Sequence, residues 1–344
     1  MADDAIRLPD PSKLLVSSSP HIHDAKDVRG IMLAVVVALV PGCAAGVWFF
    51  GPRALLVLAV CAATCVGFEA VLCRLLGRPA TIGDLSALVT GLLLGMNLSA
   101  GTPWWVCVIG SVIAIGLGKQ VYGGLGYNLF NPALVGRVAL LLAFPKILTT
   151  WVPPVTGWWA GRVPEALAAD GLTSATPLGL WKNSGTLLTQ GGDYVQLLVG
   201  NRPGCLGETS AIALVLGGLY LIWKGHIRWQ VPVAFIGTVA LFTGIVYAGH
   251  RGTAPTPLFH VLSGGLLLGA IFMATDMVTT PMGKLGGVLF GVGCGLVTCV
   301  IRCYGGYPEG VSFSILLMNA LTPLIDRLTA RRPFGDVRRK ESAA

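Results

Sequence analysis

Ten apolar segments, separated by shorter polar stretches, constrain this chain more than any other feature. A helix needs about 20 mostly apolar residues to cross the hydrocarbon core of a membrane. The segments are residues 30–51, 54–76, 84–99, 103–118, 132–150, 207–223, 231–249, 258–275, 285–301 and 311–326. Only 12% of the 344 residues are charged, whereas about a quarter are charged in a soluble domain. The sequence therefore predicts an all-α, polytopic membrane protein, and it excludes both a soluble enzyme and a disordered chain.

Short motifs recur in the two halves of the chain. Thr90–Gly95 in the third segment resembles Gly264–Gly269 in the eighth, and Tyr122–Gly124 after the fourth resembles Tyr304–Gly306 after the ninth. Both matches pair segments five apart, and because five is odd the second half is expected upside down relative to the first. Chance recurrence of Gly/Leu strings is the alternative. The third, fourth and tenth segments are short and glycines interrupt several, so the prediction is two inverted five-helix repeats with broken helices.

Basic residues predict the orientation in the membrane. With both termini inside, inner segments carry 16 Lys and Arg residues and outer segments carry six, as the positive-inside rule requires. The predicted parts are a cytoplasmic N-terminal tail (1–29), a first five-helix repeat (30–150), an outer loop (151–206), a second five-helix repeat (207–326) and a basic cytoplasmic tail (327–344). The dispersed charges indicate no nucleic-acid partner, and the polar N-terminal tail does not resemble a cleavable signal peptide.

Residues able to bind metals show no binding pattern. The nine cysteines include no CxxC pair, so small apolar packing residues are favoured over cluster ligands. Ionisable side chains in or near the apolar segments are more informative, because each is costly in hydrocarbon. They are Glu69, Asp84, Arg137, Glu208 and Asp276. Two interpretations stay open for them, namely cation binding at a cavity and pairing or snorkelling at helix ends.

The stretch from Gly118 to Ala133 is rich in glycine and side-chain amides. Irregular polar backbone within a membrane protein is tolerated only against protein or a cavity. Gln120, Asn128 and Asn131 offer the donors and acceptors that a planar heterocycle needs. The alternative is that the asparagines only cap the helix that begins at Pro132.

The outer loop carries a hydroxyl-rich string from Asp170 to Leu178. It resembles the flavinylation motif Asp-x-x-Ser/Thr-Gly-Ala-Thr, in which the last threonine receives FMN through a phosphoester bond. The matching positions are Asp170, Thr173, Ser174, Ala175 and Thr176, with Ser174 where glycine is usual.

Further stretches resemble the same family along the whole chain. They are Ser19–His21, Lys119–Ala133, Gly207–Ser210, Phe272–Asp276 and Tyr304–Asn319. The family is that of the D subunits of Rnf ion-translocating oxidoreductases (RnfD), with the B subunit of the sodium-pumping NADH:quinone reductase (NqrB) as its near neighbour.

The resemblance implies two flavins and a redox function. Thr176 would carry covalent FMN on the outer face, and a non-covalent riboflavin would lie within the helix bundle, with Gln120, Asn128 and Asn131 as its candidate contacts. The protein would pass electrons between ferredoxin and NAD, coupled to Na⁺ or H⁺ transport. Flavins supply the redox chemistry, and the protein supplies position and tuning.

The resemblance also implies partners and a location. The partners are the other subunits of a membrane redox complex, including an outer-face flavoprotein subunit and cytoplasmic ferredoxin- and NAD-reactive subunits, together with a flavin transferase for maturation. The location is the bacterial inner membrane, with the Thr176 loop on the periplasmic side. The alternative function is a solute channel or secondary transporter with an inverted-repeat fold, which has no use for flavin. A purely structural subunit is a third class.

Overall fold

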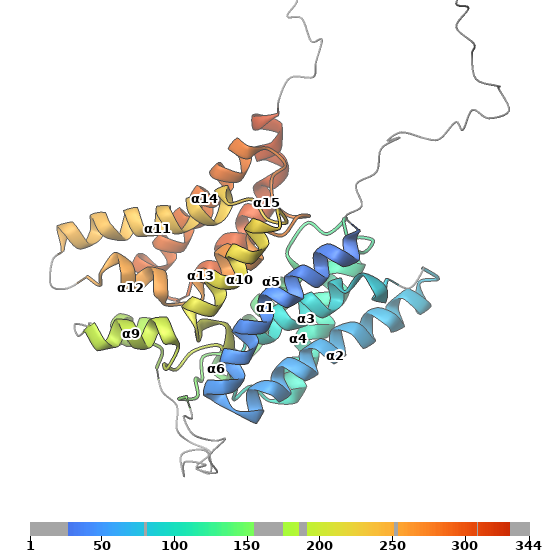
Figure 1. Cartoon of the computed structure of the whole chain (residues 1–344), viewed down its shortest axis with the longest axis horizontal. Coiled ribbons are helices and arrows are strands. Elements are labelled where there is room, and N and C mark those ends of the chain that lie inside the picture. Colours follow the sequence, from blue (N-terminus) through green and yellow to red (C-terminus); the bar gives the residue numbers. More distant parts are fainter. Residues whose placement is uncertain are drawn as a thin grey trace, which may run out of the picture.

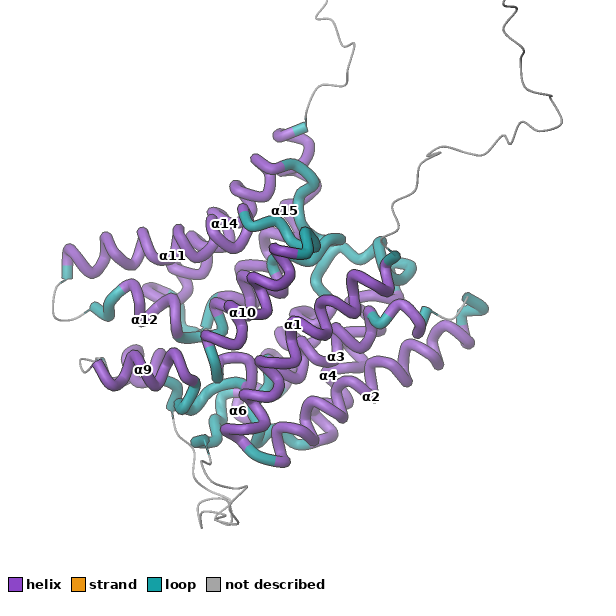
Figure 2. The backbone as a smooth tube through the Cα atoms, viewed as in Figure 1, coloured by secondary structure: helices purple, strands orange, loops and turns teal. Residues whose placement is uncertain are grey.

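The computed structural model describes residues 27–78, 81–154, 175–185, 191–250, 254–307 and 309–330. Within these residues the chain is built of helices joined by loops, with no β-strand (Figure 2). The first half comprises α1 (Val28–Phe50), α2 (Pro52–Leu75), the short η2 (Ile82–Asp84), α3 (Ser86–Met96), α4 (Trp104–Ile115), the π-helix η3 (Gly116–Gln120), α5 (Pro132–Ala143) and α6 (Pro145–Leu148).

The second half follows a connection that contains two short helices. These are α8 (Pro177–Ser184) and α9 (Gly191–Val199). The second half then comprises η5 (Leu206–Glu208), α10 (Ala211–Trp223), α11 (Gln230–Gly249), α12 (Pro257–Leu262), α13 (Leu266–Leu268), the π-helix η6 (Gly269–Met273), α14 (Lys284–Tyr304) and α15 (Val311–Thr329).

Each of the ten predicted apolar segments contains helix, which confirms the all-α, polytopic fold class. Among the described residues, α1, α2, α11, α14 and α15 are each long and apolar enough to cross a membrane alone. Shorter apolar helices occupy most of the other segments: α3, α4 with η3, α5 and α10. The tenth segment is longer than the sequence predicts, because α15 continues to Thr329 and has 19 residues.

The fifth segment ends earlier than predicted. The prediction of one span over 132–150 is wrong, since α5 stops at Ala143 and α6 begins at Pro145. Proline lacks a backbone N–H and disfavours helical geometry in the residue before it, which is here Phe144. Lys146 therefore lies on α6, beyond the end of the span.

The eighth segment is broken, as the repeated glycines predict. Between α12 and α13, Gly264 and Gly265 have φ values of +72° and +63°, a region that glycine enters without steric cost. The buried Arg302 side chain binds this break by donating to the carbonyl oxygens of His260, Ser263 and Gly264 at 2.6, 3.0 and 3.0 Å. An arginine from α14 thus satisfies backbone groups that the broken helix leaves free.

The helices pack in the two groups that the repeated motifs predict. In the first half α2 contacts α3 and α4, and α4 contacts α5; in the second half α11 contacts α12 and α14, and α14 contacts α15. The halves meet where α1 packs on α10 and where α5 contacts α15. Each of these pairs joins helices that hold the same place in the order of the two predicted repeats. In Figure 1 the blue-to-green half lies to the right of the yellow-to-red half.

The bundle has two distinct ends. In Figure 1 the start of α1 and the end of α15 lie at one end, and α6 lies at the other. Exposed tryptophans occur at helix termini that belong to both ends: Trp48 and Trp104 on one side, Trp223 and Trp229 on the other. Tryptophan favours both membrane–water interfaces, so these side chains fit a bundle that spans a bilayer.

Candidate functional site

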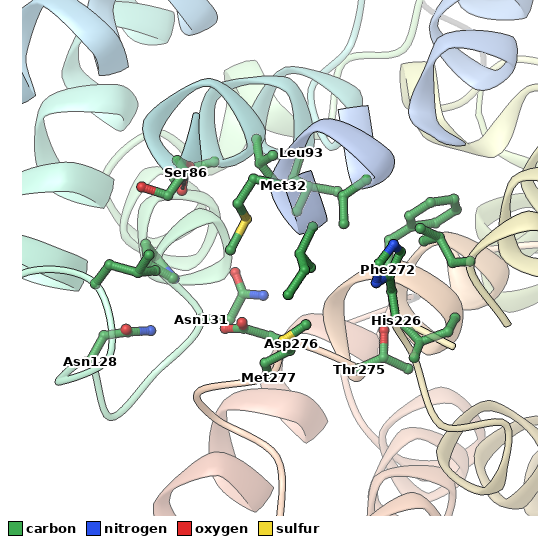
Figure 3. Close-up of a pocket in the computed structure, with 18 of the residues that line it drawn as sticks. Met32, Ser86, Leu93, Asn128, Asn131, His226, Phe272, Thr275, Asp276 and Met277 are labelled. Atoms are coloured by element: carbon green, nitrogen blue, oxygen red, sulfur yellow. Dashed lines mark hydrogen bonds between the residues drawn. The ribbon is translucent and has the colours of Figure 1, made fainter. Parts of the chain in front are cut away.

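A pocket lies between the two halves at the end of the bundle where α1 begins. Its cavity has a volume of about 80 Å³ and is partly open to solvent. Figure 3 shows Asn131 and Asp276 near its centre, Asn128 on one side, and Phe272 and His226 on the other. Apolar walls come from α1, α3 and η6. We call this the inner pocket.

Both the oxygen and the nitrogen of the Asn131 side-chain amide form hydrogen bonds within the protein. Its Oδ1 accepts from the backbone N–H groups of Ala133 and Leu134 at 3.1 and 3.4 Å and so caps α5. Its Nδ2 donates to the carbonyl oxygen of Met273 at 3.3 Å. The structure therefore gives Asn131 the capping role that was the alternative to ligand contact, although the residue also lines the inner pocket.

The side chain of Asn128 has an unpaired hydrogen-bond acceptor. Its Nδ2 donates to the carbonyl oxygen of Phe130 at 3.1 Å, whereas its buried Oδ1 has no hydrogen-bond partner among the described residues. Leaving a buried acceptor unpaired costs about 1–3 kcal/mol. Because Asn128 lines the inner pocket, a ligand with an N–H group there would satisfy this oxygen.

Gln120 does not line the inner pocket. Its Nε2 donates to the carboxylate of Glu69 at 3.3 Å. Lys119 donates to both oxygens of Glu69 at 2.7 and 2.9 Å and to the Ser86 hydroxyl at 2.5 Å, and Thr81 donates to Glu69 at 2.7 Å. The Glu69 and Lys119 side chains are almost wholly buried.

Lys119 and Ser86 line the inner pocket and were missed by the sequence analysis. A signal for Lys119 was present, because a carboxylate such as Glu69 within an apolar helix needs a buried cation as its partner. The structure thus favours pairing over cation binding for Glu69. Asp84 is likewise engaged, since its Oδ1 accepts from the Ser86 N–H at 2.8 Å and from the Ser86 hydroxyl at 2.6 Å.

A second pocket lies at the other end of the bundle and contains Thr176. Its cavity has a volume of about 210 Å³ and lies between α3, α5, α6, α8 and the turn after α14; we call it the outer pocket. Thr176 is the N-cap of α8, with its Oγ accepting from the Gly179 N–H at 3.1 Å. Ala175 also lines this pocket. Asp170, Thr173 and Ser174 lie outside the described residues.

Two cationic side chains border the outer pocket. Lys182, on α8, donates to the carbonyl oxygens of Ile301, Arg302 and Tyr307 at 3.2, 3.1 and 2.8 Å. Arg137, on α5, pairs with Glu309 and donates to the Asn97 side chain at 3.1 Å. Arg137 is among the ionisable residues that the sequence singles out. Lys182 is not, because its carbonyl partners lie about 120 residues away in the chain and leave no local signal.

Asn97 and Met273 connect the walls of the two pockets. The Asn97 Nδ2 lies 3.5 Å from the Met273 sulfur, and the Met273 carbonyl accepts from Asn131. Asn97 lines the outer pocket and Asn131 the inner one. Among the described residues, no group of three His, Cys, Asp or Glu side chains is arranged to hold a metal ion.

A helical bundle with several apolar, membrane-length helices and a pocket at each end defines an all-α, polytopic membrane protein. A family model described as the NQR2, RnfD, RnfE family matches residues 15–335. The chain belongs to this family.

Curated relatives match over nearly the whole chain. The D subunit of the Na⁺-translocating ferredoxin:NAD⁺ oxidoreductase complex of Acetobacterium woodii is 44% identical over 335 residues, covering 96% of this chain and 98% of the relative. The D subunit of the proton-translocating ferredoxin:NAD⁺ oxidoreductase complex of Clostridium ljungdahlii is 46% identical over 327 residues, covering 93% and 96%. The D subunit of the ion-translocating oxidoreductase complex of Stutzerimonas stutzeri is 44% identical over 329 residues, covering 90% and 92%.

Proposed function

We propose that this chain is the membrane flavoprotein subunit of an ion-translocating ferredoxin:NAD oxidoreductase. It carries FMN covalently on Thr176 in the outer pocket and riboflavin non-covalently in the inner pocket. Its relatives are named as D subunits of such complexes, one translocating Na⁺ and one translocating protons at nearly equal identity to this chain. The proposal therefore includes Na⁺ or H⁺ as the ion.

One observation carries the assignment of the outer pocket. The threonine that matches the flavinylation motif lines the outer pocket and caps the N-terminus of α8. A helix N-terminus favours a phosphate group through its free N–H groups and its dipole. Lys182 adds positive charge at the border of the same pocket, whereas Arg137 is already paired there with Glu309. Trp151, Leu148 and Tyr307 supply an apolar wall for the ring system.

The attachment forms a phosphoester at Thr176. The threonine Oγ bonds to the phosphorus of the FMN half of a flavin dinucleotide, the pyrophosphate bond breaks, and the departing AMP takes the hydroxyl proton. The protein gains the mass of FMN less one water. This reaction requires the flavin transferase as a maturation partner.

The inner pocket suits riboflavin, which lacks the phosphate of FMN. The cation that lines it, Lys119, is already neutralised by Glu69, so no free positive charge from this pair is available for a phosphate. The unpaired Asn128 oxygen offers an acceptor for a ring N–H, and Phe272, Leu93 and Met32 offer apolar contact. Flavins bound in the two pockets supply electron transfer, while the chain fixes their positions and surroundings.

The proposed partners follow from the position of each pocket. The outer pocket belongs to the face that binds an outer flavoprotein partner, and the inner pocket to the face of the cytoplasmic ferredoxin- and NAD-reactive subunits. The proposed setting is the bacterial inner membrane, with both termini cytoplasmic and Thr176 on the periplasmic face.

The proposal is tested by the flavin content of protein co-expressed with a flavin transferase. We expect a yellow protein with one FMN on the peptide that contains Thr176 and one acid-extractable riboflavin. A solute channel or secondary transporter, the alternative function, would be purified without either flavin.

A further inference from the structure

The hydroxyl proposed to receive FMN is buried. Thr176 is 5% exposed, and its Oγ is engaged by the Gly179 N–H. The three residues that follow it, Pro177, Leu178 and Gly179, are buried as well. The outer pocket is too small to admit the active site of a transferase, which must bring its donor to the Thr176 oxygen.

The first turn of α8 is held by apolar packing. Leu178 is 1% exposed and forms a small cluster with Leu197 of α9 and Phe259 of α12. It also lies against the helix break, where its Cδ2 is 3.0 Å from the position that a Cβ on Gly264 would take. The close approach depends on the missing side chain of Gly264.

The last turn of α8 is held by hydrogen bonds from a charged side chain. The Lys182 ammonium donates to three carbonyl oxygens at the C-terminal end of α14 and in the turn that follows it. Cations are stabilised at this end of a helix, where carbonyl groups lack partners. Burial lowers the pKa of Lys182, which agrees with an ammonium drawn out of solvent by these bonds.

We infer that α8 is a detachable helix, and that FMN is attached to Thr176 while α8 is released from its contacts with α12, α14 and the Gly264 break. Leu178 and Lys182 are positioning residues that set the population of the released form. After attachment α8 docks again and carries the flavin into the outer pocket. The inference rests on the proposed function, because it concerns the modification of Thr176.

The first test measures flavin attachment in vitro. Full-length protein expressed without a transferase is reconstituted in nanodiscs and mixed with purified transferase, Mg²⁺ and flavin dinucleotide. While the released form is rare, the initial rate is proportional to its population. Removing the hydrogen bonds of a charged group, or a buried leucine side chain, favours the released form, so Lys182→Met and Leu178→Ala should each raise the rate at least about tenfold, which corresponds to about 1.4 kcal/mol in that equilibrium.

Matched controls exist on the same face of the protein. Leu180→Ala removes a side chain of the same kind from α8, but Leu180 is 39% exposed. Lys146→Met removes an exposed lysine from α6. Both controls should be modified at the rate of the unsubstituted protein. Because Leu178→Ala also removes core packing, support for the detachable helix requires the same direction of change in Lys182→Met.

The second test needs no transferase. In Thr176→Cys protein, the reaction of the new thiol with an impermeant maleimide is followed by the mass of its own peptide, so native cysteines do not interfere. Adding Lys182→Met should speed this labelling about tenfold, in line with the attachment rate.

The outcomes separate the inference from the proposed function. If Thr176 never gains FMN, even after long incubation, the proposed function fails. If Thr176 gains FMN, but Lys182→Met and Leu178→Ala raise neither the attachment rate nor the thiol labelling rate above the controls, the detachable helix is refuted and the proposed function stands.

Discussion

Asn131 joins the two halves of the fold, because its side-chain amide donates to the carbonyl oxygen of Met273 at 3.3 Å. The same side chain caps α5 through its Oδ1. Met273 is the last residue of the π-helix η6, and its sulfur contacts Asn97 beside the outer pocket. One asparagine thus fixes the start of α5, the wall of the inner pocket and the contact between the repeats.

Replacement of Asn131 should lower the stability of the protein and leave flavin binding unchanged. Asn131→Ala removes a helix cap, worth about 1 kcal/mol, and a hydrogen bond between the halves, worth about as much again. We expect a lower midpoint of thermal unfolding with an unchanged ratio of riboflavin to covalent FMN. Asn201→Ala, at an exposed position, is the control. Loss of riboflavin without loss of stability would show that Asn131 serves the ligand instead.

Replacement of Asn128, in contrast, should reduce the binding of riboflavin. Its buried Oδ1 has no hydrogen-bond partner among the described residues, and under the proposed function it accepts from riboflavin. Asn128→Leu should therefore release riboflavin during purification while FMN stays on Thr176. The measurement is acid-extractable riboflavin against covalent FMN, with Asn201→Leu as the control. An unchanged ratio would remove Asn128 from the site.

Removing one charge of the buried Glu69–Lys119 ion pair should lower stability strongly, whereas removing both charges together should lower it much less. Glu69→Gln leaves the Lys119 ammonium buried without its counter-charge, a loss of about 3–5 kcal/mol. Glu69→Gln combined with Lys119→Met removes both charges and should recover much of that stability. Unfolding of both variants and of Lys119→Met completes a double-mutant cycle. Equal stability of Glu69→Gln and the unsubstituted protein would contradict the ion pair.

The predicted orientation is tested by labelling in intact cells. Ser184, exposed on α8, should react with an impermeant thiol reagent as Ser184→Cys, whereas Ser342→Cys in the C-terminal tail should not. Labelling at both positions, or in the tail alone, would overturn the assignment of opposite faces.

Much of the fold could be predicted because hydropathy is a local property of the sequence. The apolar segments, the break at Gly264 and the motif at Thr176 are all recognisable within short windows. The end of α5 at Ala143 was missed because the apolar run continues past Pro145, although proline ends the helix.

Side-chain partners could not be predicted, since they depend on contacts between distant segments. Sequence proximity groups Gln120 with Asn128 and Asn131, but the Gln120 side chain donates to the buried Glu69 carboxylate and does not line the inner pocket. Lys182 gains its role only when folding brings α8 onto the end of α14.

Covalent flavin on Thr176 underlies the proposed function, and peptide mass measures it directly. Protein co-expressed with a flavin transferase is digested, and the peptide containing residue 176 is compared between the unsubstituted chain, Thr176→Ala and Thr173→Ala. We predict FMN less one water on that peptide in the unsubstituted chain and none in Thr176→Ala, with any modification of Thr173→Ala still on Thr176. Covalent flavin that persists in Thr176→Ala, or an unmodified residue 176 in the unsubstituted chain, would contradict the proposed function.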